Sequence, residues 1–318
     1  MRIITADDIA DTLSYESLIE ALRRAFRDDI TVPVRHHHVL SRPGADATLL
    51  LMPAWTAASS GFVGCKVVTV FPDNATRDKP SLYGSYFLLS GETGEPLAVI
   101  DGRVLTAWRT AAASALAATF LARADASHLV MIGAGALAPH LIAAHAAVRP
   151  IRKVTLWNRT RRRADELAVR LGRQDLALAV ADDLEAAVRA ADIVSCATLA
   201  SEPLVCGSWL KAGVHVDLVG GFTPTMREAD DEAMIRARVY VDTGAGTREA
   251  GDIVDPIRRG VIAESDISGD LFALCRGTAS GRQSASEITL FKSVGSAIED
   301  LAAAMLLWRE LGDNAAAI

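Results

Sequence analysis

The pattern of hydrophobic positions changes twice along the chain. Over residues 14–28, apolar side chains that include Leu18, Leu22 and Phe26 recur at helical spacing, which predicts an amphipathic helix. From residue 32 to residue 89, short β-rich runs are separated by Pro and Gly turns, which predicts an antiparallel sheet. Beyond residue 129, apolar strands alternate with helical segments, as in βαβ units with a parallel sheet.

The second half contains the elements of a nucleotide-binding fold. We expect parallel strands over residues 129–132, 153–157, 193–196, 215–219 and 238–241. We expect a helix of small residues over 110–123, and further helices that begin near residues 136, 161, 183 and 226. Residues 289–311 also have a helical pattern, and this last helix could cross back to pack on the first half.

Length predicts more than one domain. The chain has 318 residues, 50% of them hydrophobic, which is more than a single core usually holds, so we expect two domains. The predicted fold class is α/β. A Rossmann-type, doubly wound parallel sheet domain takes residues 116–295, and an α+β domain takes residues 1–115 and 296–318.

Composition argues against several classes of protein. The formal net charge is −6 and no basic block is present, so we expect no nucleic-acid partner. The N-terminal residues include early acids and no apolar core of a signal sequence, and no stretch reaches the roughly 18 uncharged apolar residues of a membrane span, so we expect a soluble, cytoplasmic protein. The four cysteines are far apart, which favours reduced core thiols over disulfides or a zinc site.

A glycine-rich turn follows the first strand of the second half. Residues 133–138 read Gly-Ala-Gly-Ala-Leu-Ala, with Gly133, Gly135 and Ala136 at the start of the predicted helix. Glycines let the backbone approach a pyrophosphate closely, and a helix N-terminus offers N–H groups to it. Because a strand precedes the turn and a helix follows it, we expect a dinucleotide site; a purely structural turn is the alternative.

The end of the second strand bears on cofactor choice. An NAD-specific site usually has an acid there, but this chain has Asn158, Arg159 and Thr160, followed by three more arginines. Hydrogen-bond donors and positive charge suit a 2′-phosphate, so we expect NADPH to bind more tightly than NADH. The alternative is a solvated basic helix start.

Three cations of the first half, Arg35, Lys66 and Arg109, stand in apolar or turn-rich surroundings. Lys66 lies in a strand-like apolar run, where an ammonium either reaches the surface or meets an anion. Thr110 could open the long helix and so point backbone N–H groups at a phosphate.

Several runs in this order resemble the ornithine cyclodeaminase/mu-crystallin family. They are residues 64–68 with 71–74, 80–81, 105–112, 132–135 and 289–295, and the likeness spans nearly the whole chain. It implies a homodimer whose sheet domains meet, and a substrate carboxylate held between the domains by Arg35, Lys66 and Arg109.

The resemblance also implies roles for further residues. Thr110, Gly133, Gly135 and Ala136 match the family's phosphate contacts. Ser81 and Tyr83 fall where the family lines the pocket for substrate and nicotinamide. The positions near the nicotinamide end are Val219, Gly220, Lys292, Ser293 and Gly295, of which the last three could equally be packing residues.

Phe222 is a departure from the cyclodeaminases, which place an Asp there for amine chemistry. A phenyl ring can neither accept a proton nor pair with an ammonium. The run over residues 221–228 instead resembles members that reduce the cyclic ketimines Δ1-pyrroline-2-carboxylate and Δ1-piperideine-2-carboxylate. Alternatively, Phe222 is a core residue and Asp217 takes over a polar task.

Reduction of a small cyclic imino acid needs few catalytic groups. The chain would hold the carboxylate and exclude water, and Lys66, with a pKa lowered by nearby guanidiniums, is our candidate for the proton supply, with Arg109 beside it. The alternatives are an ornithine cyclodeaminase, an alanine dehydrogenase-like enzyme, and a non-catalytic protein that binds NADPH and a small ligand.

We expect no metal site. Successive side chains of His36, His37 and His38 would alternate between the faces of an extended segment, and no acid or cysteine motif completes a ligand set. The acidic stretch around Asp252 and Asp255 is expected to be a solvated loop and helix cap rather than a calcium site.

Overall fold

The computed structural model describes residues 1–57, 61–172 and 175–315, and the chain divides into two compact units. Unit 1 consists of Met1–Arg109 and Ser296–Ile318, and unit 2 of Thr110–Gly295. The sequence analysis placed the first boundary at residues 115/116. In the structure it falls between Arg109 and Thr110, within the long helix α3 (Gly102–Leu121).

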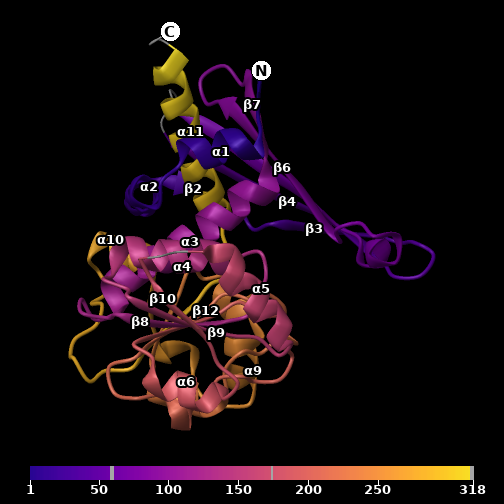
Figure 1. Cartoon of the computed structure of the whole chain (residues 1–318). Coiled ribbons are helices and arrows are strands. Elements are labelled where there is room, and N and C mark those ends of the chain that lie inside the picture. Colours follow the sequence, from indigo (N-terminus) through magenta and orange to yellow (C-terminus); the bar gives the residue numbers. More distant parts are fainter. Residues whose placement is uncertain (58–60, 173–174, 316–318) are drawn as a thin grey trace. The chain divides into compact units, whose positions relative to one another are not determined.

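Unit 1 contains a mostly antiparallel sheet, as expected (Figure 1). Its order is β1-β7-β6-β5-β4-β2, and β3 also pairs with β4. The strands are β1 (Arg2–Ile4), β2 (Ile30–Thr31), β3 (His36–Leu40), β4 (Ala47–Thr56), β5 (Phe62–Val70), β6 (Leu82–Ser90) and β7 (Pro96–Asp101). The short β1, which the sequence analysis missed, pairs with β7 in parallel.

The two faces of this sheet differ. Cross-strand register aligns one row of mostly apolar side chains that is buried: Ile4, Ile100, Tyr86, Lys66 and Met52. Strand alternation places the neighbouring residues on the opposite face, which is more exposed. That second row consists of Ile3, Val99, Phe87, Cys65 and Pro53.

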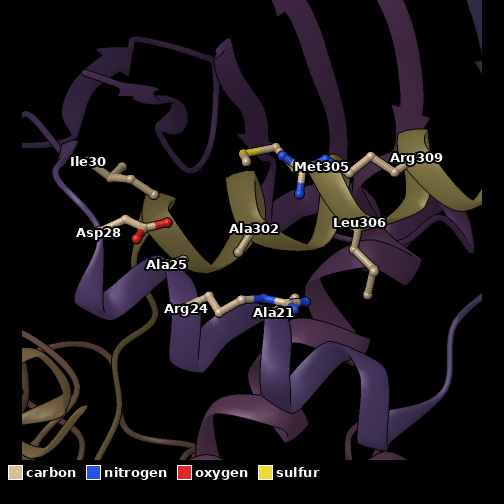
Figure 2. Close-up of a pocket in the computed structure, with 9 residues that line it drawn as sticks. All are labelled: Ala21, Arg24, Ala25, Asp28, Ile30, Ala302, Met305, Leu306 and Arg309. Atoms are coloured by element: carbon tan, nitrogen blue, oxygen red, sulfur yellow. The ribbon is translucent and has the colours of Figure 1, made fainter. Parts of the chain in front are cut away.

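Helices cover the buried face. The amphipathic helix expected over 14–28 is confirmed as α2 (Tyr15–Arg27), capped by Ser14, and it packs against α11 (Ala297–Ala315). Helix α11 also contacts β4, β5 and α1 (Ala6–Thr12), so the last helix does return to the first half. Facing alanines leave a shallow hollow between α2 and α11, along which Arg24 extends (Figure 2). None of the predicted site residues lines it.

Unit 2 contains a parallel sheet of the Rossmann type. Its order is β10-β9-β8-β11-β12-β15-β13-β14, and every described pair is parallel. The strands are β8 (His128–Ile132), β9 (Lys153–Trp157), β10 (Ala177–Val180), β11 (Ile193–Cys196), β12 (His215–Leu218), β13 (Arg238–Val241), β14 (Ile267–Asp270) and β15 (Thr289–Lys292). The strand order reverses between β8 and β11, where such sheets bind ligands at their carboxyl edge.

Short helices connect these strands. They are α4 (Ala138–Val148), α5 (Arg161–Leu171), α6 (Leu184–Ala190), α7 (Asp231–Arg236), α8 (Gly246–Glu249), α9 (Gly251–Arg258) and α10 (Leu271–Arg276). Three 3-10 turns complete the description: η1 (Pro72–Arg77), η2 (Gly207–Trp209) and η3 (Glu264–Asp266). The five predicted strands and the helices near 161 and 183 are confirmed, whereas β10 and β14 were missed.

Three element predictions were wrong. Residues 289–292 form strand β15, inserted between β12 and β13, because an apolar run buried on both faces resembles a helix in sequence. The helix expected near residue 226 begins at Asp231, after the N-cap Asp230. Helix α3 begins at Gly102 instead of residue 110, because Asp101 accepts hydrogen bonds from the N–H groups of the first turn.

Helix α3 is long and apolar enough to cross a membrane by length and composition alone. It contains Arg103 and Arg109, so it is not one of the uncharged stretches considered in the sequence. Moreover, 67% of its most apolar window is buried inside the protein, as in a core helix.

Candidate functional site

A cleft of about 880 Å³, open to solvent, lies at the carboxyl ends of β8, β9 and β11 in unit 2. Its lining residues come from the turns after these strands: Gly133, Ala134, Gly135, Trp157, Asn158, Arg159, Thr160, Arg163, Ala197, Thr198, Leu199, Ala200 and Leu204. The structure thus brings the glycine turn and the end of β9 together, as the sequence predicted.

The two glycines of the turn have different reasons to be glycine. Gly133 has φ +104°, and a Cβ there would lie 2.5 Å from the Ala197 carbonyl oxygen, so only glycine fits. A Cβ at Gly135 would meet nothing within 4 Å. The open space over Gly135 is what a pyrophosphate needs in order to approach the backbone.

Helix α4 begins at Ala138, later than expected, and Ala136 is an exposed residue of the preceding turn. Ala136 is not among the residues that line the cleft. No side chain caps the first turn of α4, but Ala138 donates its N–H to the Gly135 carbonyl (3.2 Å) and Pro139 has no N–H. The positive end of the helix dipole still favours a phosphate group there.

Asn158 lines the cleft and also makes hydrogen bonds within the chain. Its Oδ1 accepts a hydrogen bond from the Ala134 backbone N (3.2 Å), and its Nδ2 donates to the Thr160 carbonyl (2.9 Å). Asn158 therefore joins the glycine turn to the loop after β9, and one of its two amide N–H groups is used within the chain.

The basic run after β9 divides into two groups. Arg161 pairs with Asp182 and Asp165, and Arg162 pairs with Glu166. Within the described residues neither Arg159 nor Arg163 pairs with an acid, and both line the cleft. The positive charge available to a ligand therefore comes from Arg159 and Arg163 rather than from the whole run.

The predicted residues at the far side of the sheet edge belong to a buried network. Gly220 donates its N–H to Glu228 (2.8 Å), while the Lys292 ammonium lies 3.0 Å from Asp252 and 3.7 Å from Glu228. All three charged side chains are fully buried. Burial, more than any other influence, raises the pKa of Glu228, while Lys292 opposes that rise. The Lys292 charge is thus paired with acids inside the protein, although its buried ammonium has no hydrogen bond of normal geometry to them.

Ser293 and Gly295 are likewise held internally. The carboxylate of Asp242 accepts hydrogen bonds from the Ser293 hydroxyl (3.2 Å) and from the N–H groups of Val294 (2.7 Å) and Gly295 (2.6 Å). Val219, directly after β12, is buried and donates its N–H to the Cys196 carbonyl. The packing alternative considered for Lys292, Ser293 and Gly295 accounts for these contacts.

Sequence reasoning missed the acids of this region. Asp252 was expected in a solvated loop, but it is fully buried and accepts the N–H groups of Glu228 and Ala229. Asp252 lies in the first turn of the proline-containing helix α9, where an acid normally indicates an exposed helix start. No signal in the chain pointed to its burial.

Two of the three predicted cations meet in unit 1. The Lys66 ammonium lies 2.7 Å from Asp300, and the Arg109 guanidinium donates to Asp300 (3.0 Å) and to Glu299 (2.5 Å). Lys66 also donates to the Thr106 hydroxyl (3.3 Å). All four charged residues are buried, at 4% exposure or less. The anion that Lys66 was expected to meet is thus, in the structure, a carboxylate of the chain itself.

The acids Glu299 and Asp300 were not foreseen as partners. They are two adjacent charges within an otherwise apolar stretch of the last helix, and this was the available signal. Because α11 packs on β5, that stretch faces the buried row containing Lys66.

The lowered pKa of Lys66 is confirmed, at about 8. Burial is the largest cause, since it disfavours the charged ammonium, and Arg109 lowers the pKa further. Asp300 and Glu299 act in the opposite direction. The predicted contribution of nearby guanidiniums is thus present from Arg109 but is not the leading one.

Not all of the predicted substrate-binding residues lie beside Lys66 and Arg109 in the structure. Arg35 precedes β3 and is half-buried, and no described contact links it to Lys66. Tyr83 is 48% exposed and pairs with Thr69, so alternation along β5 and β6 places it on the face opposite Lys66. Ser81 accepts the Phe71 N–H through its carbonyl. Within one chain, Tyr83 therefore does not join the Lys66 group.

Thr110 does not open a helix, contrary to the prediction. It lies within α3 and is 7% exposed, so its N–H is part of the helical hydrogen bonding and cannot point at a phosphate. A phosphate contact by its side-chain hydroxyl stays a prediction.

The alternative reading of Phe222 is wrong. Phe222 is 51% exposed and so is no core residue. Asp217 lies fully buried inside β12, where it accepts hydrogen bonds from Ser195 (2.7 Å) and contacts His145 (3.2 Å). Asp217 thus serves the sheet interior and not the carboxyl edge where Phe222 stands.

No three or more metal-ligating side chains gather among the described residues. The rings of His36 and His38 lie 6.3 Å apart, as alternation along β3 predicts, and all three histidines of the run are exposed.

Comparison with known proteins extends over the whole chain. The family model for the ornithine cyclodeaminase/mu-crystallin family matches residues 2–314. Protein SAR DEFICIENT 4 of Arabidopsis thaliana is 44% identical and the match covers 96% of this chain and 95% of the relative. A Delta(1)-pyrroline-2-carboxylate reductase of Colwellia psychrerythraea is 38% identical, with 98% and 100% covered.

A solved structure is similar over nearly the same length. The Delta(1)-pyrroline-2-carboxylate reductase of Thermococcus litoralis, in complex with NADH and L-proline, has a TM-score of 0.92 at 32% identity. The match covers 99% of this chain and 98% of that chain.

Proposed function

The chain belongs to the ornithine cyclodeaminase/mu-crystallin family, and from this premise we propose that it is an oxidoreductase that reduces cyclic ketimines. The substrates we propose are Δ1-pyrroline-2-carboxylate, reduced to L-proline, and Δ1-piperideine-2-carboxylate, reduced to L-pipecolate. Support comes from a reductase of this name at 38% identity and a similar structure that holds NADH and L-proline.

The cleft in unit 2 suits a nicotinamide dinucleotide. The open space over Gly135, the uncapped first turn of α4 and the ordered loop at Asn158 would receive the pyrophosphate and adenosine ribose. When bound, the reduced nicotinamide supplies the hydride. The chain's own task there is to hold the dinucleotide in one orientation.

Lys66 and Arg109 are the proposed binding group for the substrate carboxylate, with Arg35 as a third cation. The observation that carries this proposal is a buried ammonium with a pKa of about 8 beside a buried guanidinium. Asp300 and Glu299 hold these two cations in fixed positions, so little ordering is required when a ligand arrives. Asp300 and Glu299 also neutralise the positive charges of Lys66 and Arg109. The net positive charge that attracts a substrate carboxylate must therefore come from Arg35.

Lys66 is also the proposed source of the imine proton. A cyclic ketimine protonated on nitrogen is already an electrophile, so no nucleophile is needed. An ammonium with a pKa near 8 is mostly protonated at neutral pH and can give up its proton more readily than an ordinary lysine.

We propose NADPH as the preferred cofactor, with NADH weaker. Arg159 and Arg163 line the cleft without acid partners among the described residues, and no acid follows β9 to hold a ribose 2′-hydroxyl. The Thermococcus litoralis relative was solved with NADH, so the proposed preference for NADPH depends on the arginines of this chain.

A panel of substrates tests the proposal. NADPH oxidation is measured with Δ1-pyrroline-2-carboxylate, with Δ1-piperideine-2-carboxylate, and with pyruvate and ammonia. Because cyclisation of ornithine to proline and ammonia causes no net oxidation of the cofactor, proline formation is measured with ornithine and NADP⁺. We expect turnover with the two cyclic imines. Turnover with pyruvate and ammonia alone would indicate an alanine dehydrogenase-like enzyme, and cyclisation of ornithine would indicate a cyclodeaminase. NADPH binding without any turnover would favour the non-catalytic binding protein.

We further propose a homodimer in the cytoplasm. The exposed sheet face of unit 1 carries a cross-strand row in which Ile3 is 73% exposed and Phe87 is 40% exposed. Such a row on a monomer is a typical interaction surface. The cytoplasmic location stays a prediction from the sequence.

A further inference from the structure

One buried side chain joins two loops at the carboxyl edge of the unit 2 sheet. Oε1 of Glu228 accepts hydrogen bonds from the backbone N of Thr198 (2.7 Å) and from its hydroxyl (2.9 Å). Oε2 accepts from the backbone N atoms of Gly220 (2.8 Å) and Gly221 (3.3 Å). Thr198 follows β11 and lines the cleft, whereas the two glycines follow β12. Any movement of Glu228 therefore affects both loops.

The loops are packed so closely that their spacing is fixed. A Cβ on Gly220 would lie 2.0 Å from the Thr198 carbonyl oxygen and 2.5 Å from Glu228 Oε1. No side chain fits there, which explains the glycine by contact with the Thr198 loop.

Glu228 is itself held from behind. Its own backbone N and that of Ala229 donate to Asp252 (2.7 and 3.1 Å), and Asp252 pairs with Lys292 at the end of β15 (3.0 Å). The Glu228 carboxylate receives four hydrogen bonds, from the Thr198 N–H and hydroxyl and from the Gly220 and Gly221 N–H groups. All four groups are donors, and an ionised carboxylate is an acceptor only, so donors and acceptors are matched. The nearby Lys292 ammonium compensates for part of the buried negative charge.

We propose that Glu228 is a positioning residue for the dinucleotide. It does not line the cleft; it acts through Thr198, whose loop it keeps in register with Gly220 and Gly221. Asp252 and Lys292 fix Glu228 to the sheet. The ligand is the nicotinamide dinucleotide, so this inference rests on the proposed function, but the tie between the loops is a property of the ligand-free protein.

The test substitutes Glu228→Gln, which keeps the shape but replaces one acceptor oxygen by an NH₂ group that faces N–H donors. Glu232→Gln is the matched control, because Glu232 is on the neighbouring helix α7 and is half exposed. Two readouts are taken: amide hydrogen exchange of the ligand-free proteins, and NADPH affinity followed by the fluorescence of Trp157 in the cleft.

For Glu228→Gln we expect faster exchange at Thr198, Gly220 and Gly221, unchanged exchange in the strands of unit 2, and roughly tenfold weaker NADPH binding. Glu232→Gln should match the natural chain. Unchanged exchange at the three amides, or acceleration spread evenly over unit 2, would overturn the inference. If Glu228→Gln does not fold, Glu228→Asp keeps the charge and shortens the reach, and the same readouts decide.

A failure of the proposed function would give a different result. If neither the natural chain nor Glu232→Gln bound NADPH or NADH, the dinucleotide proposal would fail. The exchange measurement on the ligand-free proteins would still report whether Glu228 joins the loops.

Discussion

Lys66 combines burial with three charged neighbours, Arg109, Asp300 and Glu299. Its ammonium rests on Asp300 and stands beside Arg109, on the sheet face that α11 covers. The sequence left two possibilities for Lys66, reaching the surface or meeting an anion, because an isolated buried ammonium is too costly. The structure shows the second. The sequence could not predict Asp300, which is 234 residues away and comes near only through the packing of α11.

Activity should depend on the protonation of Lys66. Its pKa is lowered to about 8, so the protonated form prevails below pH 8 and is lost as the pH rises through that value. We expect kcat/KM for Δ1-pyrroline-2-carboxylate to fall about tenfold per pH unit above this point. Lys66→Arg stays charged throughout, so its rate, whatever its absolute value, should not show this fall. If kcat/KM of Lys66→Arg still falls above pH 8, the pH dependence belongs to the titration of another group.

Arg159 and Arg163 should determine cofactor preference. Arg159→Ala removes one of the two cleft guanidiniums, and we expect kcat/KM for NADPH to fall by about 10- to 100-fold while that for NADH changes little. Arg162→Ala is the control, because Arg162 pairs with Glu166 outside the cleft. Equal affinity of the natural chain for NADPH and NADH would contradict the assignment.

At the scale of elements, periodicity predicted the strands that carry the dinucleotide site but not every boundary. Strands such as β8, β9 and β11 have short apolar runs bounded by turns, and the site follows directly from their ends. Strand β15 was taken for helix because a buried parallel strand shows no alternation. The start of α3 was misplaced because Asp101, which caps it, was not recognised as the N-cap.

The burial and the partners of three acids of unit 2 could not be predicted from the sequence. Glu228, Asp242 and Asp252 accept backbone N–H groups of loops that are distant along the chain. An acid near glycines or at a helix start normally reads as solvated, and only the folded loops reveal its partners. The contacts of the positions expected near the nicotinamide end were therefore not foreseen, and their part in cofactor binding stays a prediction.

The carboxyl end of α3 gives a prediction for stability. Arg149 donates to the carbonyl oxygens of Ala118, Thr119 and Ala122, which lie in or just beyond the last turn of that helix. Arg149→Met should lower the free energy of unfolding by about 2 kcal/mol, because these half-buried carbonyls lose a charged donor. Urea denaturation measures this, with the exposed Arg152→Met as control. An unchanged midpoint would show that water replaces the guanidinium at no cost.

At the scale of the whole molecule, the chain combines a Rossmann-type unit with a unit whose sheet has one uncovered face. The observed units, 1–109 with 296–318 and 110–295, lie close to the expected domains. The expected and the observed division both assign the last helix to the first unit. Register makes the uncovered face continuous across five strands, from Ile3 through Val99 and Phe87 to Pro53.

This face should be the dimer interface. Phe87→Glu places a charge in the centre of the exposed row, and we expect the mass in sedimentation to drop from that of two chains to that of one. Val169→Glu is the control, because Val169 is an equally apolar but isolated exposed residue of α5. If the natural chain sediments as a monomer, the dimer proposal is wrong.

The central claim is that Lys66 and Arg109, although paired with Asp300 and Glu299, bind the carboxylate of the imino acid. A crystal structure of the chain with NADP⁺ and L-proline tests this most directly, through the distances from the proline carboxylate to these two side chains. Our account predicts that the carboxylate lies within hydrogen-bond distance of both the Lys66 ammonium and the Arg109 guanidinium. A proline bound elsewhere, with Lys66 and Arg109 still contacting only the two acids, would contradict it.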